Sequence, residues 1–412
     1  MRDLWMRYRR GTALCAGFLA VCGLAVAILG TTDSHASTPH VPSAESVVLE
    51  RVPASAGDPA ARELAILRAR LDAAPRDPAL ATAYARKNIE MSRRESDPRF
   101  LGHAQAALAP WWDEREPPSD VLLLRATIRQ SLHEFEPALA DLDILAVSTP
   151  GDPQVWLTRA VVLAVRGKYA EARESCVPLA RLTSAWVTAT CFASIDSQTG
   201  KAKDAYAKLT ATLRRDPPSD PAGTAWALSS LGEVAQRAGD DDGAERDFRS
   251  ALEADPADVY ARAALCDLLL DRGRPADALP LLAGKEKDDG LLLRLALAET
   301  AAKAKGAGAH VDTLRARHDA SRSRGDVVHR REHARFELAF GEPRAALALA
   351  RANWDVQKEP ADARVLLESA LAAGEPDAAQ AATEFLAAAG AEEPRLVAAR
   401  ARVVAARKGA SR

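Results

Sequence analysis

The chain has 412 residues, with 55 Lys and Arg against 57 Asp and Glu, which gives a formal net charge of −2. This balance offers no overall basic excess and therefore argues against a nucleic-acid-binding protein. The composition, 48% hydrophobic and 27% charged, is typical of a folded chain and excludes an intrinsically disordered one, and five Cys are too few for a disulfide-rich scaffold.

Residues 1–36 have the pattern of an export signal. Four Arg and one acid lie within residues 1–10, and residues 12–30 contain no charged side chain. The sequence Ser34-His35-Ala36 is typical of a signal-peptidase site and favours cleavage after Ala36. The uncharged run also nearly matches the thickness of a bilayer, so retention as a membrane anchor through residues 12–30 is the alternative. Both interpretations predict an exported chain, either periplasmic or anchored in the inner membrane with the remainder in the periplasm.

The next two segments lead into the main body of the chain. Residues 37–57 are rich in Pro, Ser and Ala and predict a flexible leader. Residues 58–84 predict an N-terminal helical half unit.

An internal repeat covers residues 85–392. A small anchor residue recurs at a nearly constant interval, at Ala104, Ala138, Ala172, Ala205, Ala244, Ala278, Val311, Ala346 and Ala379, where Val311 is the exception in size. Five residues before seven of these anchors stands a Gly, at positions 167, 200, 239, 273, 306, 341 and 374. We expect the small residues to let two helices approach closely, and each Gly to end a first helix in the left-handed conformation. The pattern predicts helix pairs in copies 1–4 (residues 85–217) and copies 5–9 (residues 218–392).

These columns resemble the tetratricopeptide repeat (TPR), a helix–turn–helix unit of about 34 residues. In the best copy, residues 224–256, the matching positions are Leu228, Leu231, Gly232, Ala235, Gly239, Ala244, Phe248, Ala251 and Pro256. The resemblance implies an all-α fold, an α-solenoid of about nine helix pairs, with a capping helix and basic tail in residues 393–412. The copies at 290–323 and 359–390 match less well, since Glu299 and Val311 replace small residues.

The resemblance also implies a function. TPR proteins generally bind another protein, as an extended peptide or a helix, in the concave groove that the first helices line, so we expect a non-catalytic scaffold or assembly factor of the bacterial envelope. It implies no catalytic residue, metal, cofactor or nucleic-acid partner. The candidate groove residues are Gln154, Thr190, Ser194, Trp226, Ser229, Glu233, Tyr260, Asp267, Arg331, Arg335, Arg364 and Glu368.

Within this set, Trp226 and Tyr260 stand one repeat length apart on adjacent first helices. We expect the two rings to project side by side into the groove, where buried aromatic side chains contribute strongly to binding. Glu233 and Asp267 add negative charge along the same helices. The expected ligand is therefore an apolar segment with nearby Lys or Arg.

One short motif offers an enzymatic alternative. His329-Arg-Arg-Glu332-His333 matches the H-x-x-E-H pattern of zinc-dependent hydrolases. The segment lies in the first helix of a repeat, and no third ligand is identifiable, so we favour a solvated, charged helix face.

For the following Cys and Trp residues, the sequence favours structural roles. Cys266 falls in a small-residue column and is expected to pack there. Cys176 and Cys191 fall on neighbouring helices, and sequence alone leaves open whether they are bonded. Trp111 and Trp112 lie near the end of a second helix, where we expect them in the core.

Overall fold

The computed structural model of the protein describes residues 59–95, 97–304, 306–325 and 328–410. The predicted export signal and leader lie outside these residues. Among the helices that the structure describes, none is both long and apolar enough to cross a membrane.

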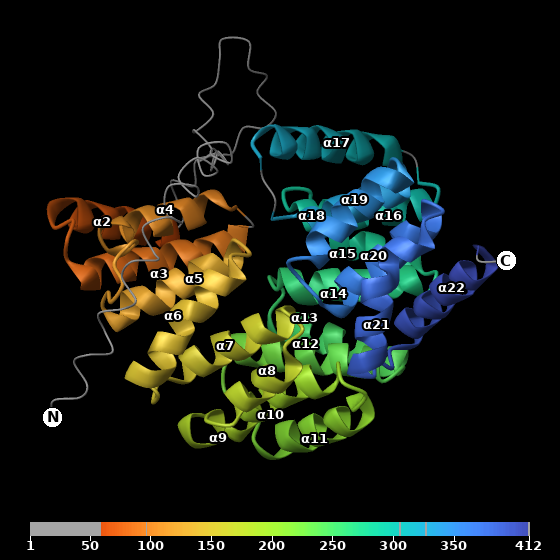
Figure 1. Ribbon diagram of the computed structural model, residues 1–412. Coiled ribbons are helices and arrows are strands. Elements are labelled where there is room, and N and C mark those ends of the chain that lie inside the picture. Colours follow the sequence, from red (N-terminus) through yellow and green to blue (C-terminus); the bar gives the residue numbers. More distant parts are fainter. Residues whose placement is uncertain (1–58, 96, 305, 326–327, 411–412) are drawn as a thin grey trace, which may run out of the picture. The chain divides into compact units, whose positions relative to one another are not determined.

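The described residues fold into α-helices and two short 3₁₀ turns, without strands (Figure 1). The elements, in chain order, are α2 (Pro59–Ala73), α3 (Pro78–Glu95), α4 (Arg99–Ala107), η1 (Ala109–Trp111), α5 (Ser119–Ser131), α6 (Phe135–Ser148), α7 (Pro153–Val165), α8 (Tyr169–Cys176), α9 (Leu179–Leu182), α10 (Ala185–Asp196), α11 (Ala202–Arg215), α12 (Pro221–Arg237), α13 (Asp241–Ala254), α14 (Val259–Asp271), α15 (Pro275–Leu282), α16 (Asp289–Ala301), α17 (Ala307–Ser323), α18 (Arg330–Phe340), α19 (Pro343–Trp354), α20 (Pro360–Ala372), η2 (Pro376–Ala379), α21 (Gln380–Ala389) and α22 (Pro394–Ala410).

The helices pack in sequential pairs. A first helix such as α12 packs against its second helix, α13, and against the neighbouring first helices α10 and α14. The same arrangement recurs from α3 and α4 to α20 and α21, and α22 packs on α20 at the end. The predicted α-solenoid is confirmed. Helix α17 departs from the pattern, because Leu314 and His318 are its only buried side chains.

Local sequence explains where the helices begin. Six of them start after an Asp whose carboxylate accepts a hydrogen bond from a backbone N–H of the first turn. This side-chain cap satisfies a donor that has no partner within the helix. The capping residues are Asp77, Asp152, Asp220, Asp240, Asp258 and Asp288.

Most of the predicted Gly turns are left-handed. Positive φ angles occur at six of the seven column positions, namely Gly167, Gly200, Gly239, Gly273, Gly306 and Gly374. At Gly341 the prediction is wrong, because its φ of −127° is not left-handed. In the copy that contains Gly306, helix α16 already ends at Ala301, and Lys303 (φ 54°) makes the turn. His133 (φ 60°) takes the place of Gly in the second copy.

The small-residue columns form the interface between paired helices. Eight of the nine anchors, all except Val311, are at most 4% exposed. At Gly232 a Cβ atom would lie 2.8 Å from the ring of Phe248, so only Gly allows α12 and α13 to approach this closely. Cys266 is fully buried, as predicted, and burial raises the pKa of its thiol to about 12. Trp111 is also buried, as predicted.

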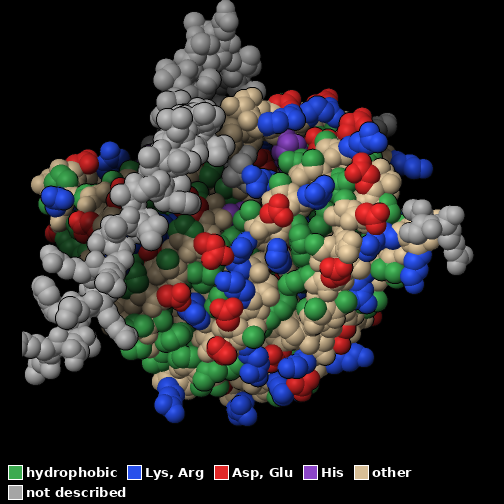
Figure 2. Space-filling model, in the orientation of Figure 1, with side chains coloured by type: hydrophobic (Ala, Val, Ile, Leu, Met, Phe, Trp, Pro, Cys, Tyr) green, Lys and Arg blue, Asp and Glu red, His purple; other side chains and the backbone are tan. Residues whose placement is uncertain are grey.

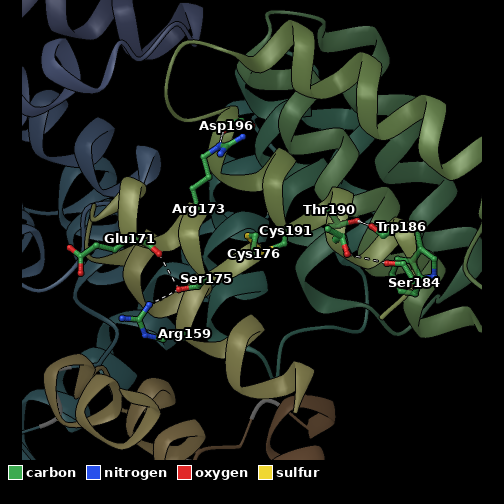
Figure 3. Close-up of a disulfide and its surroundings, with 11 residues drawn as sticks. Arg159, Glu171, Arg173, Ser175, Cys176, Ser184, Trp186, Thr190, Cys191 and Asp196 are labelled. Atoms are coloured by element: carbon green, nitrogen blue, oxygen red, sulfur yellow. Dashed lines mark hydrogen bonds and ion pairs between the residues drawn. A yellow bond between two sulfur atoms is a disulfide. The ribbon is translucent and has the colours of Figure 1, made fainter. Parts of the chain in front are cut away.

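A disulfide bond joins Cys176 of α8 to Cys191 of α10 (Figure 3). The two Cα atoms lie 5.9 Å apart, and both side chains are buried. The bond lies where the second helix of its copy breaks at Val177 and Pro178 and resumes as α9. It links this interrupted helix to the first helix of the next copy, which settles the pairing that the sequence left open.

A second kind of contact joins copies that are far apart in sequence. The backbone N–H of Lys358 donates to the carbonyl oxygen of Val165 at 2.7 Å, and the Arg166 guanidinium donates to the carbonyl oxygen of Val356 at 2.6 Å. The Glu392 carboxylate accepts from the backbone N–H of Ala202 at 2.6 Å. We call this set, together with the pairs described next, the long-range contact.

The long-range contact continues along the turns of four successive copies. A hydrogen bond of 2.9 Å joins the Gln357 amide to Nδ1 of His133. Arg395 forms a two-pronged ion pair with Asp241, with N–O distances of 2.6 and 2.9 Å. The segments 355–358 and 390–395 thus pack against turns that lie several copies earlier in the chain.

Candidate binding hollow

A hollow of about 1550 Å³ lies along the first helices. Its lining comes from α3, α5, α7, α12, α14, α16, α18 and α20, together with residues next to helix ends such as Asp255 and Glu393. The first helices therefore form the concave surface, as the resemblance implied. Hollows of this size exceed the volume of an ordinary small-molecule pocket and accommodate a polypeptide segment.

Eight of the twelve predicted groove residues line this hollow. They come from α7, α12, α14, α18 and α20, and therefore from helices widely separated in sequence. These residues are Gln154, Glu233, Tyr260, Asp267, Arg331, Arg335, Arg364 and Glu368.

The other four predicted residues do not line it. Thr190 is fully buried, and its hydroxyl donates to the carbonyl oxygen of Trp186 at 2.8 Å (Figure 3). Ser229 is buried as well, and Ser194 uses its carbonyl oxygen to accept from Gln198 within its own copy. The buried side chains of Thr190 and Ser229 therefore serve packing, and the half-buried Ser194 is not part of the lining.

Trp226 also lies elsewhere than expected. Its ring packs edge to face on Trp186, with centroids 5.7 Å apart, and remains 39% exposed. The expected pairing of Trp226 with Tyr260 is therefore corrected: Tyr260 is the aromatic residue of the hollow, and it is 57% exposed.

The hydroxyl of Tyr260 donates to the carboxylate of Glu233, which belongs to the preceding first helix. Glu233 also pairs with Arg237 at 3.2 Å, one turn further along α12. These bonds hold the Tyr260 hydroxyl against the wall, while the residue stays 57% exposed in the lining of the hollow.

The arginines of the hollow are held by acids from neighbouring first helices. Asp267 of α14 accepts from Arg294 of α16 at 2.6 Å and from Arg335 of α18 at 2.7 Å. Burial opposes ionisation of this carboxyl, but the two guanidinium groups hold its pKa well below the usual range. The three residues join three successive first helices.

A second ion pair joins residues that are even farther apart in the sequence. Arg364 of α20 binds both oxygens of Asp271 of α14, at 2.6 and 2.8 Å, and also pairs with Glu368 at 2.8 Å. Although burial disfavours its charged form, the two acids raise the pKa of Arg364. Arg331 pairs with Glu359 at 2.9 Å. The predicted basic residues are therefore engaged in holding the wall together.

Several residues that line the hollow were not predicted from the sequence. Asp271 follows Asp267 by one helical turn on the same face of α14, and this spacing was the available signal. Arg294 lies in α16, and the poor match of its copy to the repeat hid this residue. Glu393 lies just before α22, in a loop that the repeat pattern does not describe.

The zinc alternative gains no support from the geometry. No group of three or more His, Cys, Asp or Glu side chains in the described part of the chain is arranged to hold a metal ion. His333 stacks on His318 of α17, with centroids 4.3 Å apart, and Glu332 lines the hollow. The expected solvated helix face is also wrong, because this face packs against α17 on one side and borders the hollow on the other.

The surface of the protein carries mixed charge. On the face shown in Figure 2, acidic and basic side chains are interspersed, and neither sign gathers into one large patch. This distribution agrees with the nearly balanced net charge.

No protein-family model matches the chain, and no curated protein matches it in sequence. Among solved structures, a tetratricopeptide repeat protein from Parabacteroides merdae ATCC 43184 is 16% identical, with a TM-score of 0.37 over 69% of this chain and 98% of that chain. The human IFIT1 dimer with m7Gppp-AAAA is 13% identical, with a TM-score of 0.47 over 80% and 78% of the two chains. The yeast Tom70 structure is 12% identical, with a TM-score of 0.35 over 85% and 93%.

These are similarities of fold, and no function is transferred from them. The helix pairs, left-handed turns and buried small-residue columns of the chain itself define a TPR-like α-solenoid.

Proposed function

We propose that the protein is a non-catalytic interaction scaffold or assembly factor that binds a partner protein in the hollow. The observation that carries this proposal is the hollow of about 1550 Å³, which the first helices line and which contains the half-exposed ring of Tyr260. Ion pairs between neighbouring first helices fix its walls, so the surface exists before a partner arrives. A preformed surface binds with a smaller loss of conformational entropy than a flexible one.

We further propose that the scaffold acts in the bacterial envelope, in the periplasm. The uncharged run of residues 12–30 and the site at Ala36 support export, and the disulfide bond fits an oxidising compartment. A permanently anchored form is the alternative, in which residues 12–30 remain in the inner membrane. Mass measurement of the mature protein separates the two, because only the anchored form retains residues 1–36.

Blocking the hollow tests the binding function. Ala264 of α14 lines the hollow, and Ala264→Trp fills part of it. Ala398→Trp on the exposed face of α22 is the matched control, because it adds the same side chain outside the hollow. Each protein is used to capture partners from solubilised envelopes, and the captured proteins are quantified by mass spectrometry.

We expect the wild type and Ala398→Trp to recover the same partner, and Ala264→Trp to lose it by about 10-fold or more. Circular dichroism establishes that all three proteins are equally helical. Equal recovery by Ala264→Trp would contradict binding in the hollow.

A further inference from the structure

The charges that line the hollow are unevenly distributed. The C-terminal wall, which we define as the lining residues from Ala222 to Glu393, carries ten carboxylates and five arginines. The N-terminal wall, defined as the lining residues of α3, α5 and α7, carries one carboxylate, Glu90, and the three arginines Arg86, Arg93 and Arg94. The two walls therefore differ in the sign of their charge, although the whole chain is almost neutral.

Three carboxylates of the C-terminal wall form no ion pair with a cationic side chain among the described residues. These are Asp255, Asp258 and Asp288, which accept hydrogen bonds from the backbone N–H groups of Ala257, Ala261 and Leu291. Backbone donors stabilise a carboxylate without cancelling its charge. Burial raises the pKa of Glu393, and the neighbouring guanidinium groups of Arg237, Arg364 and Arg395 only partly oppose this rise.

Asp258 and Asp288 hold equivalent positions. Each is the N-cap of a first helix, α14 or α16, and these two helices are in contact. The two charges therefore lie along the same edge of the wall. Tyr260 stands two residues after Asp258, and its hydroxyl is bound to Glu233.

An exposed aromatic ring in a wall that also carries unpaired carboxylates suits a cationic side chain. The face of the ring attracts an ammonium or guanidinium group, and the neighbouring carboxylates add direct Coulomb attraction. Apolar side chains from the same wall, including Leu270, Leu297 and Leu338, line the hollow further along.

We propose that the segment bound in the hollow is a cationic amphipathic one, with Lys or Arg placed against Tyr260 and the carboxylates at Asp258 and Asp288, and with apolar residues on the leucines. This inference rests on the proposed function and specifies its partner. The arginines of the N-terminal wall disfavour the same cations, so the segment is oriented with its basic face toward the C-terminal wall. An acidic segment would meet the uncompensated carboxylates instead.

The test uses two synthetic probes. One is a fluorescein-labelled helical peptide of four to five turns built from Leu, Ala and Lys, and the other is identical except that each Lys is replaced by Glu. Binding to the mature protein is measured by fluorescence anisotropy at low and at high salt. We expect the Lys peptide to bind at least about 10-fold more tightly than the Glu peptide at low salt, with the difference shrinking as salt is added.

Charge-removing variants locate the effect. Asp258→Asn with Asp288→Asn removes two charges from the hollow, and it keeps both helix caps because Asn caps as well as Asp. Asp152→Asn with Asp240→Asn is the matched control, since these N-caps lie outside the lining. We expect the first pair to weaken binding of the Lys peptide by about 3- to 10-fold and the control pair to leave it unchanged.

The outcomes separate this inference from the proposed function. Equal affinity for both peptides, preference for the Glu peptide, or equal effects of the two variant pairs would overturn the charge preference. So would binding of neither peptide. In each of these cases the Ala264→Trp capture experiment still decides independently whether a partner occupies the hollow.

Discussion

Two sets of turns in this solenoid share one backbone conformation and differ in what surrounds them. Gly167, Gly200 and Gly239 have φ angles of 73°, 74° and 82°, and Gly273 and Gly374 have φ angles of 68° and 71°. A Cβ atom at the first three would lie 2.7 Å from the ring of Phe385, 2.9 Å from the carbonyl oxygen of Gly390 and 3.1 Å from Pro394. At Gly273 and Gly374 it would meet nothing within 4 Å.

The difference shows that Gly is needed in this column for two different physical reasons. In the later copies Gly is required only by the left-handed turn. In the middle copies it also leaves room for the long-range contact, which packs the end of the chain against these turns. That contact places first helices from both ends of the repeat array around one hollow.

The comparison is tested most severely by adding one methyl group in each region. Gly200→Ala adds both left-handed strain and a clash with the backbone of Gly390, and we expect it to lower the free energy of unfolding by about 2–4 kcal/mol. Gly273→Ala adds the backbone strain alone and should cost about 1–2 kcal/mol. Urea unfolding followed by circular dichroism measures both, and equal losses would show that the long-range contact contributes nothing.

The disulfide bond distinguishes the two regions further, because it joins the copy that contains Gly167 to the copy that contains Gly200. Cys176→Ser with Cys191→Ser opens a link between residues 15 positions apart in sequence, and we expect a loss of about 3 kcal/mol in unfolding free energy. A reducing agent should destabilise the wild type by a similar amount and leave the double variant unaffected. Stability that is insensitive to reduction would contradict a structural role for the bond.

Lowering the pH should reduce the stability of both regions, and a different His is responsible in each. Burial lowers the pKa of His133, in the long-range contact, and of His318, between α17 and α18, to about 4 in each case. In the unfolded chain a His titrates near pH ~6.5. Between about pH 6.5 and 4 the unfolded state binds more protons than the folded state, so stability is lost as the pH falls through this interval and levels off below it.

We expect a loss of about 1–3 kcal/mol for each of these histidines. His133→Asn should remove the part that belongs to the long-range contact, because Asn tolerates a positive φ and does not titrate. His318→Gln should remove the part that belongs to α17. Unfolding free energies measured across this pH interval decide the matter, and an unchanged pH dependence in His133→Asn would disprove the assignment.

The smallest effect concerns the ion pairs at the surface. Arg395→Gln removes the two-pronged pair with Asp241 in the long-range contact, where the two side chains are 22% and 30% exposed, and should cost about 1 kcal/mol. Lys208→Gln removes the pair with Asp204, a fully local i, i+4 pair, and should cost at most about 0.5 kcal/mol. Thermal unfolding of both variants compares them, and a larger effect at Lys208 would contradict the ranking.

The sequence predicted what depends on local spacing. The small columns, the helix pairs and six left-handed Gly turns follow from periodicity, because each copy forms its contacts with its immediate neighbours. Gly341 was misassigned, and Lys303 makes the turn that was expected at Gly306, because a column identifies a residue type and not the exact end of a helix.

The long-range contact was not predictable in this way. It depends on the small rotations between successive copies, which accumulate over several copies before Lys358 meets Val165. The same accumulation explains why eight of the predicted groove residues line the hollow and Trp226 does not. Trp226 packs instead on Trp186 of the preceding first helix, a side-chain contact that repeat spacing alone does not specify.

The central claim is that a partner binds inside the hollow. A photo-crosslinking amino acid placed at position 260 tests it most directly, with position 147 as the control, since Val147 is 84% exposed and does not line the hollow. After irradiation of intact cells, we expect a specific crosslinked protein at position 260 and none at position 147. Crosslinks of equal yield at both positions, or at position 147 alone, would contradict the assignment of the hollow as the binding surface.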